Sequence, residues 1–444
     1  MNKLAMSVAK HRDRIYDAEK YIWANPETGY KEKKTSAYME SHLRKMGYDL
    51  VMAEGITGFY TVIDTGREGP EVLVLCELDS VICPSHSDSD KETGAVHACG
   101  HHAQCAAMLG IAAALKEEGA LDKMCGKIRL CAVPAEELLE IEYRMKLKRE
   151  GKIKYFGGKS EFLSRGYFDG VDLAFMVHTS SVFALDLGMV GCITKKIVYK
   201  GVAAHAGGTP WFGVNALYAA NCGINAVNAI RETFKDLDFI RVHPIMTAGG
   251  DMVNAIPERA ALESYVRGRT FDAILDANRK VNRALIGAAI SLGANVEIID
   301  IPGYAPLENN TGMVDSALEA FKSVFNSDDI HVSDRIATGS SDMGDLSCIM
   351  PIVHAYAGGA IGKGHGNDYK IEDTEKACID SAKWQVALLH VLMSNGAKRA
   401  KEIVSSFKPR FASKKEFLDF VDNIYTSGDR IKYHNEGMAE AILK

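Results

Sequence analysis

The chain has 444 residues, which is too many for one compact core, so we expect two domains. Hydrophobic residues make up 47% of the sequence and charged residues 25%, as in ordinary folded globular proteins. The 58 acidic and 52 basic residues are spread along the chain and give a net charge of -6, which argues against nucleic acid or an anionic membrane as the main partner.

The lengths of the apolar runs and the spacing of the cysteines indicate the cellular compartment. The longest run of small apolar residues, 106–115, is far too short to span a bilayer, and the charged segment 1–20 lacks the apolar core of a signal peptide. The ten cysteines form no Cys-x-x-Cys pair and show no spacing typical of a disulfide framework. We therefore expect a protein of the reducing cytoplasm.

Helices and buried strands alternate over the first 180 residues. Helical periodicity predicts one helix that ends at Asn25-Pro26 and a second over residues 34–46. A third helix is predicted over 102–118. Continuous apolar runs predict buried strands of the parallel type at 72–76, 128–133 and 171–177. The order is typical of an α/β domain with a mostly parallel central sheet.

The pattern changes at about Gly191. From there the predicted elements are a strand at 192–200, a helix at 214–232, strands at 240–247 and 260–267, a helix at 274–292 and a strand at 296–301. This β-α-β-β-α-β order is the ferredoxin-like split unit. Buried patterns resume after Asn310, so we expect an inserted α+β domain over 191–306. The α/β domain would then comprise 1–190 and 307–444, and its charged tail beyond Lys398 carries no motif.

Candidate metal ligands follow the predicted strands. The run His97-Ala-Cys-Gly-His101 places a thiolate and an imidazole two positions apart, so both can converge on one metal ion. Pro134-Ala-Glu-Glu137 offers two adjacent carboxylates, of which one can bind a metal while the other moves a proton. His178 follows the third strand. Open α/β sheets place their sites at these carboxyl ends, so the sequence predicts a metal-dependent hydrolase.

These motifs together resemble the dinuclear-metal aminoacylase/carboxypeptidase family, in particular its amidohydrolase branch with auxin-conjugate, hippurate and p-aminobenzoyl-glutamate hydrolases. The resemblance rests on Trp23-Ala-Asn-Pro-Glu-Thr-Gly29, His97–His101, Pro134–Glu137, Gly201-Val-Ala-Ala-His205-Ala and Asn254-Ala-Ile-Pro257. The stretch Pro210-Trp-Phe-Gly-Val-Asn-Ala216 looks like the subgroup acting on aminobenzoyl-glutamate and small dipeptides. The resemblance implies a zinc-peptidase-like catalytic domain, an inserted lid and dimerisation domain, and a homodimer.

The resemblance also implies the metal site. It makes Cys99 the ligand that bridges two divalent metal ions, with a set completed by His101, Glu137, His178 and His365. Thiolate, imidazole and one carboxylate suit zinc, with manganese or cobalt as alternatives. The competing interpretation is that Cys99 is a buried structural thiol and that the lone histidines only form hydrogen bonds.

Further roles are implied for residues around the metals. Glu136 is the expected general base, which takes a proton from the attacking water and passes it to the leaving amine. Asp79 would orient a ligand histidine from outside the ligand set, although it is equally an ordinary strand-end acid. His205 would reach across the dimer to stabilise the oxyanion in the neighbouring site. Asn254 and Arg267 match positions that hold the substrate carboxylate, and nearby Arg269 leaves the choice of arginine open.

The sequence departs from the family pattern at three places near the expected pocket rim. Many relatives have Asp directly after the second motif histidine and His two positions later, where this chain has His102 and Gln104. A charged stretch, residues 138–156, replaces glycines after the paired glutamates. It is either an insertion near the mouth of the site or a plain solvated helix. The polar loop 85–93 lengthens the approach to the first motif.

The predicted reaction is hydrolysis of the amide bond between an acyl or aminobenzoyl group and an amino acid. A dipeptidase acting on small dipeptides is the first alternative, because it would share the machinery and differ only in the pocket. A catalytically silent metal-binding homologue is the second. A nucleophile pair of Cys99 and His101 is disfavoured, because residues two apart in a turn suit convergent ligation.

Overall fold

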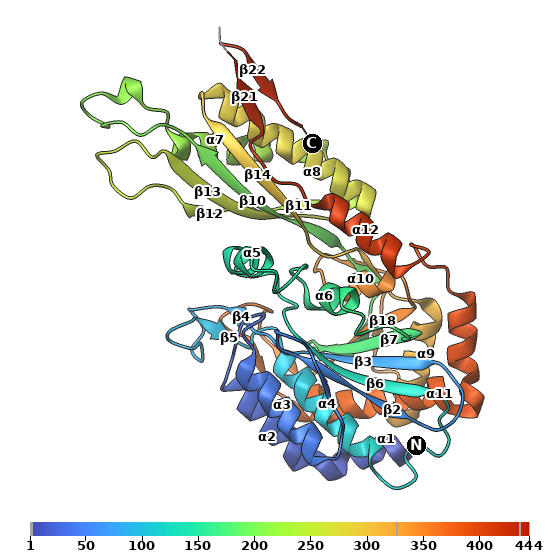
Figure 1. The fold of residues 1–444 in the computed structure, drawn as a ribbon. Coiled ribbons are helices and arrows are strands. Elements are labelled where there is room, and N and C mark those ends of the chain that lie inside the picture. Colours follow the sequence, from blue (N-terminus) through green and yellow to red (C-terminus); the bar gives the residue numbers. More distant parts are fainter. Residues whose placement is uncertain (1–2, 326, 435–436, 444) are drawn as a thin grey trace. The chain divides into compact units, whose positions relative to one another are not determined.

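The computed structural model describes residues 3–325, 327–434 and 437–443. The described residues divide into two compact units. The first consists of Met1–Gly188, Leu307–Ala337 and Asp342–Lys414, and the second of Met189–Pro306, Thr338–Ser341 and Lys415–Lys444. Figure 1 traces the chain through both. No helix of the described residues is long and apolar enough to cross a membrane.

An eight-stranded sheet forms the centre of the first unit. Its strand order is β1 (Val51–Met52), β2 (Phe59–Asp64), β6 (Lys127–Val133), β3 (Glu71–Glu77), β7 (Leu173–Thr179), β18 (Ile352–Ala357), β8 (Ala184–Leu185) and β16 (His331–Val332). The four middle strands, β6, β3, β7 and β18, are mutually parallel. Every residue of β3 is buried, as expected for a parallel strand covered on both faces.

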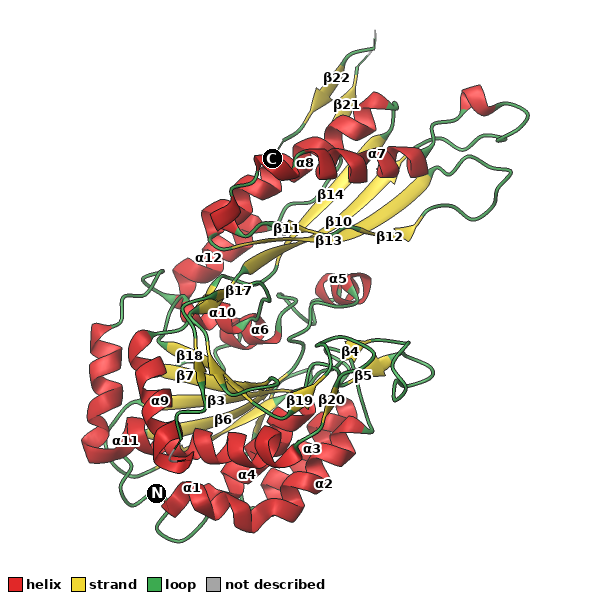
Figure 2. Cartoon of the chain, turned by 180° about the vertical axis from the view of Figure 1, so that it is seen from behind, coloured by secondary structure: helices red, strands yellow, loops and turns green. Residues whose placement is uncertain are grey.

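The first unit also contains helices, several of which lie against this sheet (Figure 2). They are α1 (Lys3–Ser7), α2 (Arg12–Trp23), α3 (Lys33–Lys45), α4 (His101–Leu115), α5 (Ile141–Arg149), α6 (Gly158–Ser164), α9 (Thr311–Phe325), α10 (Met343–Ser347) and α11 (Ser381–Ser406, interrupted at Ser394–Ala397). Short strands complete the unit: β4 (Val81–Ile82), β5 (Ala95–Val96), β15 (Leu307–Glu308), β17 (Ile336–Ala337), β19 (Ala360–Ile361) and β20 (Lys370–Ile371).

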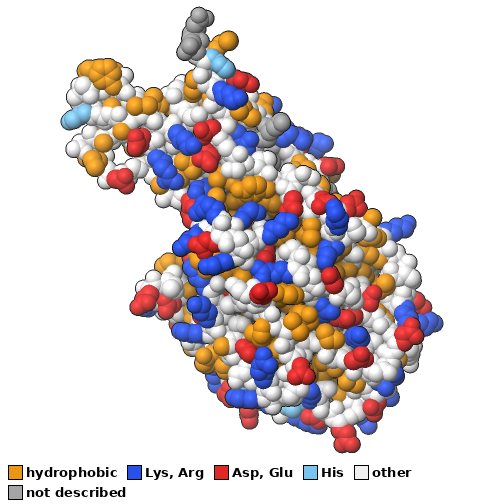
Figure 3. All heavy atoms as spheres, in the orientation of Figure 1, with side chains coloured by type: hydrophobic (Ala, Val, Ile, Leu, Met, Phe, Trp, Pro, Cys, Tyr) orange, Lys and Arg blue, Asp and Glu red, His pale blue; other side chains and the backbone are white. Residues whose placement is uncertain are grey.

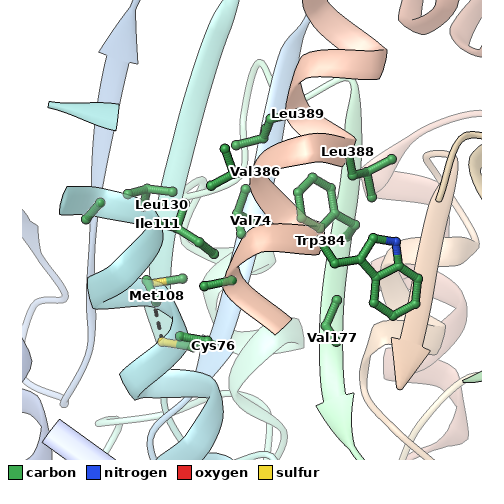
Figure 4. Close-up of a cluster of buried hydrophobic side chains, with 14 of the residues drawn as sticks. Val74, Cys76, Met108, Ile111, Leu130, Val177, Trp384, Val386, Leu388 and Leu389 are labelled. Carbon is green, nitrogen blue, oxygen red and sulfur yellow. Dashed lines mark hydrogen bonds between the residues drawn. The ribbon is translucent and has the colours of Figure 1, made fainter. Parts of the chain in front are cut away.

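The core of the first unit lies between the middle strands and two long helices. Met108 and Ile111 of α4 point toward Val74 and Leu130 of the sheet (Figure 4). Trp384 of α11 is fully buried, and its indole N–H donates to a main-chain carbonyl of α9 at 2.7 Å. Burying apolar surface of this kind contributes about 25 cal/mol per Å². The rigid base that results fixes the carboxyl ends of the parallel strands.

The elements predicted in this unit are confirmed. The first two helices, the helix after the His-Ala-Cys-Gly-His motif and the three buried strands all form, with ends displaced by a few residues at most. The third strand extends to Thr179, so His178 lies inside β7 instead of after it.

The second unit is built on an antiparallel sheet with the order β11 (Arg241–Val242), β13 (Arg259–Gly268), β10 (Gly191–Lys200) and β14 (Asn295–Pro302), while β12 (Ile245–Ala248) also pairs with β13. Helices α7 (Ala216–Ala229) and α8 (Phe271–Ser291) pack against it. The predicted β-α-β-β-α-β order is confirmed. The predicted strand over 240–247 forms as two short strands separated at His243-Pro244, because proline has no N–H to donate to a ladder.

The tail beyond Lys414 groups with the second unit, whereas the sequence predicted that it belongs to the α/β domain. Helix α12 (Lys414–Ile424) places Phe420 against Phe271, with ring centroids 4.7 Å apart. The next segment runs beside β14, where the N–H of Arg430 donates to the carbonyl of Val296 at 2.8 Å. A hairpin, β21 (Ile431–Tyr433) with β22 (Ala439–Ala441), follows. These pairings are long-range, and the charged tail showed no pattern that predicts them.

Acidic and basic side chains are interspersed over the face shown in Figure 3. Hydrophobic side chains lie between them, as in most folded proteins, where apolar atoms still supply much of the surface.

Candidate metal centre

Five side chains from different parts of the first unit converge beside the carboxyl ends of the parallel strands. They are Cys99 and His101 at the start of α4, Glu137 after β6, His178 in β7 and His365 after β19. Donor atoms of Cys99, His101 and His178 lie within 4.8 Å of one another, and so do those of Cys99, Glu137 and His365. The thiol of Cys99 therefore belongs to both groups.

The turn at Gly100 makes this convergence possible. Gly100 has a left-handed backbone with φ 88°, and a Cβ there would collide with the hydroxyls of Thr179 and Tyr369. The turn aims Cys99 and His101 the same way, and Cys99 Sγ lies 3.4 Å from His178 Nε2. On the other side, His365 Nε2 lies 2.9 Å from Glu137 Oε1.

Neighbouring acceptors direct the histidine rings. Nδ1 of His101 is 2.9 Å from the main-chain oxygen of Asp79 and 3.2 Å from its carboxylate Oδ1. The other carboxylate oxygen of Asp79 accepts the N–H of Glu137 at 2.8 Å. Nδ1 of His178 faces the carbonyl of Thr179 at 2.9 Å. Bonds of this kind hold the Nδ1–H tautomer and leave Nε2 for a metal ion.

The structure leaves a polar atom of this cluster unsatisfied. Nε2 of His101 is buried and forms no hydrogen bond within the described ranges, although Glu77 Oε2 lies 3.2 Å from it. Buried polar atoms normally have hydrogen-bond partners, so an atom without one, on a histidine that converges with Cys99 and His178, fits a bound cation. One thiolate, three imidazoles and one carboxylate match the borderline-soft ligands that zinc prefers.

The ionisation of these groups also fits metal binding. Burial and Glu137 raise the pKa of the Cys99 thiol, but the neighbouring His101 and His178 outweigh them and bring it to about 6. Burial likewise opposes ionisation of Glu137, yet His365 lowers its pKa to about 2. The same ion pair raises the pKa of His365 to about 11. The thiol and the carboxyl are thus ionised near neutral pH, whereas the histidines must release protons when a metal binds.

Glu136 lies beside the ligand groups but belongs to neither of the two triplets that share Cys99. Its carboxylate is 4.0 Å from His101 Nε2, and together with Glu77 and His101 it forms a third convergent group. Burial, followed by the charges of Glu77 and Glu137, raises its pKa well above the ordinary value. A carboxyl that holds a proton in a buried site is suited to proton transfer.

A buried ionic network beneath the site was missed by sequence reasoning. Lys159 of α6 donates to Glu77 at 2.5 Å and to Asp342, and all three side chains are fully buried. Gln104 donates to the same Glu77 at 2.9 Å. The sequence signals for this network are the departure at Gln104 and the run Gly157-Gly158-Lys159. Gln104 therefore holds Glu77 beside the site. Comparison of the motif sequence alone does not reveal this contact.

The other departure lies away from the ligand groups. His102 is buried against the ring of Trp23, with centroids 4.9 Å apart, and its Nε2 is 3.5 Å from Glu19. It takes no part in the three convergent donor groups found among the described residues.

The remaining predicted site residues lie in the second unit. His205 is exposed, and its Nδ1 accepts the N–H groups of Gly207 at 3.1 Å and Gly208 at 2.9 Å. The carbonyl of Asn254 accepts the N–H of the residue after His205 at 3.0 Å, so these two positions are neighbours. Arg267 of β13 donates to Ser340 Oγ at 3.3 Å. The five metal-ligand candidates, Asp79 and Glu136 are thus brought together in the first unit.

An α/β fold with a convergent thiolate, imidazole and carboxylate set defines a metal-dependent hydrolase of amide or peptide bonds. Comparison with protein families agrees. Residues 74–390 match the model of peptidase family M20/M25/M40, which covers more than half of the chain, and the protein belongs to that family.

Individual relatives are similar over most of the chain. A mouse (Mus musculus) Xaa-Arg dipeptidase is 26% identical over 372 residues, covering 80% of this chain and 78% of its own. The indole-3-acetyl-aspartic acid hydrolase of Enterobacter agglomerans is 27% identical over 329 residues, covering 61% and 70%. Among solved structures, an aminobenzoyl-glutamate utilization protein from Klebsiella pneumoniae superposes with a TM-score of 0.65 at 19% identity, covering 87% of this chain and 98% of its own.

Proposed function

We propose that the protein is a dinuclear-metal amidohydrolase that releases an amino acid from an N-acyl or aminobenzoyl conjugate, of the aminobenzoyl-glutamate type. The observation that carries the proposal is the sharing of Cys99 by two groups of metal-ligating side chains. The resemblance to the indole-3-acetyl-aspartic acid hydrolase and to the aminobenzoyl-glutamate utilization protein supports this substrate class.

Two zinc or manganese ions, with cobalt as an alternative, fit the ligand set. Cys99, His101 and His178 would hold one ion, and Cys99, Glu137 and His365 the other. When bound, such ions polarise the scissile carbonyl and make the attacking water more acidic. The chain supplies the orientation, because Asp79 fixes both the ring of His101 and the main chain of Glu137.

Glu136 would carry the proton. It takes a proton from the attacking water and delivers it to the nitrogen of the leaving amino acid, so that one carboxylate serves both halves of the reaction. Its raised pKa supports this role, because a strongly acidic carboxyl could not protonate an amine. Cations bound beside Glu136 would lower that pKa, because they favour the ionised carboxylate.

The second unit would supply substrate contacts. We assign oxyanion stabilisation to His205, acting in the neighbouring site of a homodimer, and binding of the substrate carboxylate to Asn254 and Arg267. Large apolar side chains near His205 support an interface there: Trp211 is 72% and Phe212 69% exposed. An apolar surface of this kind commonly marks a contact between proteins.

A dipeptidase is the second candidate, because the Xaa-Arg dipeptidase of mouse is similar over most of the chain. It would use the same metal ligands and the same proton carrier, with a pocket for an aminoacyl group. We further place the protein in the reducing cytoplasm, since all ten cysteines are free in the described residues and Cys99 must stay reduced to bind metal.

A hydrolysis screen tests the proposal. Zinc- or manganese-loaded protein would be incubated with N-acyl amino acids, aminobenzoyl-glutamate and small dipeptides, and the products identified by mass spectrometry beside the Glu136→Gln variant. Release of an amino acid from a conjugate by the wild type alone is the expected result. Cleavage of dipeptides only would favour the second candidate, and metal binding without any turnover would indicate a silent homologue.

A further inference from the structure

The charged segment 138–156 is connected directly to the turn that carries the paired glutamates. It follows Glu137 directly and contains α5, whose buried positions are Ile141, Arg144 and Leu147. A plain solvated helix would bury only apolar side chains on that side, whereas the middle position here is an arginine. A guanidinium can be buried at acceptable cost only where its N–H groups find acceptors.

The two terminal nitrogens of Arg144 find acceptors at the two ends of this segment, whereas its Nε is buried without a hydrogen bond among the described residues. One terminal nitrogen donates to the main-chain carbonyl of Glu137, and the other donates to that of Phe156 at 2.7 Å. The guanidinium also lies over the ring of Tyr30, 5.6 Å from its centroid. The Tyr30 hydroxyl donates to the carbonyl of Tyr155 at 3.0 Å. A side chain only 1% exposed thus closes the insertion into a loop anchored at Glu137.

The main chain at the glutamates needs such anchors. Ala135 and Glu140, on either side of the pair, adopt left-handed backbone with φ 56° and 52°, which is unfavourable for residues with a Cβ. The N–H of Ala135 donates to Glu32 Oε1 at 2.8 Å, and the N–H of Glu137 donates to Asp79 Oδ2 at 2.8 Å. Arg144 provides the corresponding anchor for the carbonyl side of Glu137.

The close packing around Gly29 leaves no free space between this residue, Ala135 and the Arg144 guanidinium. A Cβ at Gly29 would lie 2.9 Å from Ala135 Cα and would collide with the Arg144 guanidinium. The segment before α3, the inserted helix and the glutamate-bearing turn are therefore in direct contact. Movement of Arg144 would be transmitted to the main chain of Glu137.

We propose that Arg144 is a positioning residue and that the inserted helix α5 is a buttress that fixes the main chain at Glu136 and Glu137. The buttress sets the affinity of the metal site through Glu137 and the rate of turnover through Glu136. Only the kinetic half rests on the proposed function, because metal affinity can be measured without a substrate. Arg149, an exposed arginine on the same helix, provides a matched control.

Zinc titration of metal-stripped protein tests the proposal. Arg144→Gln is expected to weaken zinc binding by about 10–100-fold, the usual cost of removing an outer partner of a ligand. Arg149→Gln should bind zinc as the wild type does. Arg144→Lys should fall between them, since an ammonium reaches one carbonyl where the fork reaches two. In the hydrolysis assay, Arg144→Gln should lower kcat with little change in KM.

Zinc affinity of folded Arg144→Gln within about twofold of wild type would overturn the proposal, even if the melting temperature fell, because the role would then be structural only. If Arg144→Gln does not fold, Arg144→Lys decides: a loss of roughly three- to tenfold supports the buttress, and an unchanged affinity overturns it. A wild type that binds zinc but cleaves no compound of the panel would refute the proposed function, while the titration would still decide about Arg144.

Discussion

Both units bury charged side chains, but they do so in different ways. In the second unit, Lys195 of β10 donates to Asp300, to Asn278 at 2.8 Å and to Asn282 at 2.5 Å. The second carboxylate oxygen of Asp300 accepts from both asparagine amides at 2.9 Å. The three donors of the ammonium and the oxygens of the carboxylate are thus matched within the cluster, which is closed.

The cluster around Cys99 in the first unit is open by the same criterion. His101 keeps a buried nitrogen that forms no hydrogen bond among the described residues, although a Glu77 oxygen lies 3.2 Å away, and two triplets of ligand atoms share Cys99. Burial of charge is common to both regions, so burial alone does not mark a site. An incomplete set of convergent donors does, because only a further ligand can satisfy it.

The largest effect is expected at the proton carrier of the open cluster. Glu136→Gln keeps the shape of the side chain but removes its ability to accept a proton, so kcat should fall by about 10²–10⁴-fold. Zinc content should remain that of the wild type, because Glu137 is untouched. Steady-state hydrolysis by the metal-loaded variant measures this, with Glu118→Gln, an exposed glutamate, as the control. Full activity in Glu136→Gln would remove Glu136 from the mechanism.

A change at the shared ligand should affect both halves of the open cluster. Cys99→Ser replaces a thiolate by a poor ligand, so the loss of zinc affinity should exceed the about 10–100-fold cost of losing an outer partner. Both ions should be lost together. Elemental analysis after dialysis measures this, with Cys222→Ser as the matched control. Retention of one tightly held ion by Cys99→Ser would show that the thiol does not bridge.

In the closed cluster of Lys195 and Asp300, a substitution should reduce the stability of the protein without changing catalysis. Lys195→Met strands the buried Asp300 carboxylate, which should lower the free energy of unfolding by about 3–5 kcal/mol. The matched variant Lys200→Met breaks the more exposed pair with Asp429, for which about 0–1 kcal/mol is expected. Urea unfolding measures both. Equal effects of the two variants would remove the distinction between buried and exposed pairs in this unit.

The smallest effect is a dependence of stability on pH. Burial raises the pKa of Asp300, but Lys195 and the asparagine amides outweigh it and hold the pKa below its ordinary value of 3.8. The unfolded state therefore binds this proton first, and the stabilisation present above about pH 4 is lost as the pH falls through the lower folded value. Acid unfolding of the wild type beside Asp300→Asn measures this. Parallel pH profiles of the two proteins would contradict it.

Local patterns predicted much of this fold. Continuous apolar runs predicted the parallel strands, and the His97–His101 and Pro134–Glu137 motifs directed attention to their carboxyl ends, where the structure brings the ligand groups together. The contributions of Lys159 and Arg144 were not predicted, because each acts through contacts with residues distant in the sequence or with main-chain carbonyls. No local pattern in the charged tail predicts that the segment around Thr426 and Arg430 pairs with β14.

The proposed mechanism depends most on the sharing of Cys99 by two metal ions. Native mass spectrometry of the metal-stripped protein after incubation with zinc measures the number of ions held per chain. Two zinc ions per chain are predicted, and both should disappear in Cys99→Ser. A wild type that holds a single ion, or none, would contradict the account.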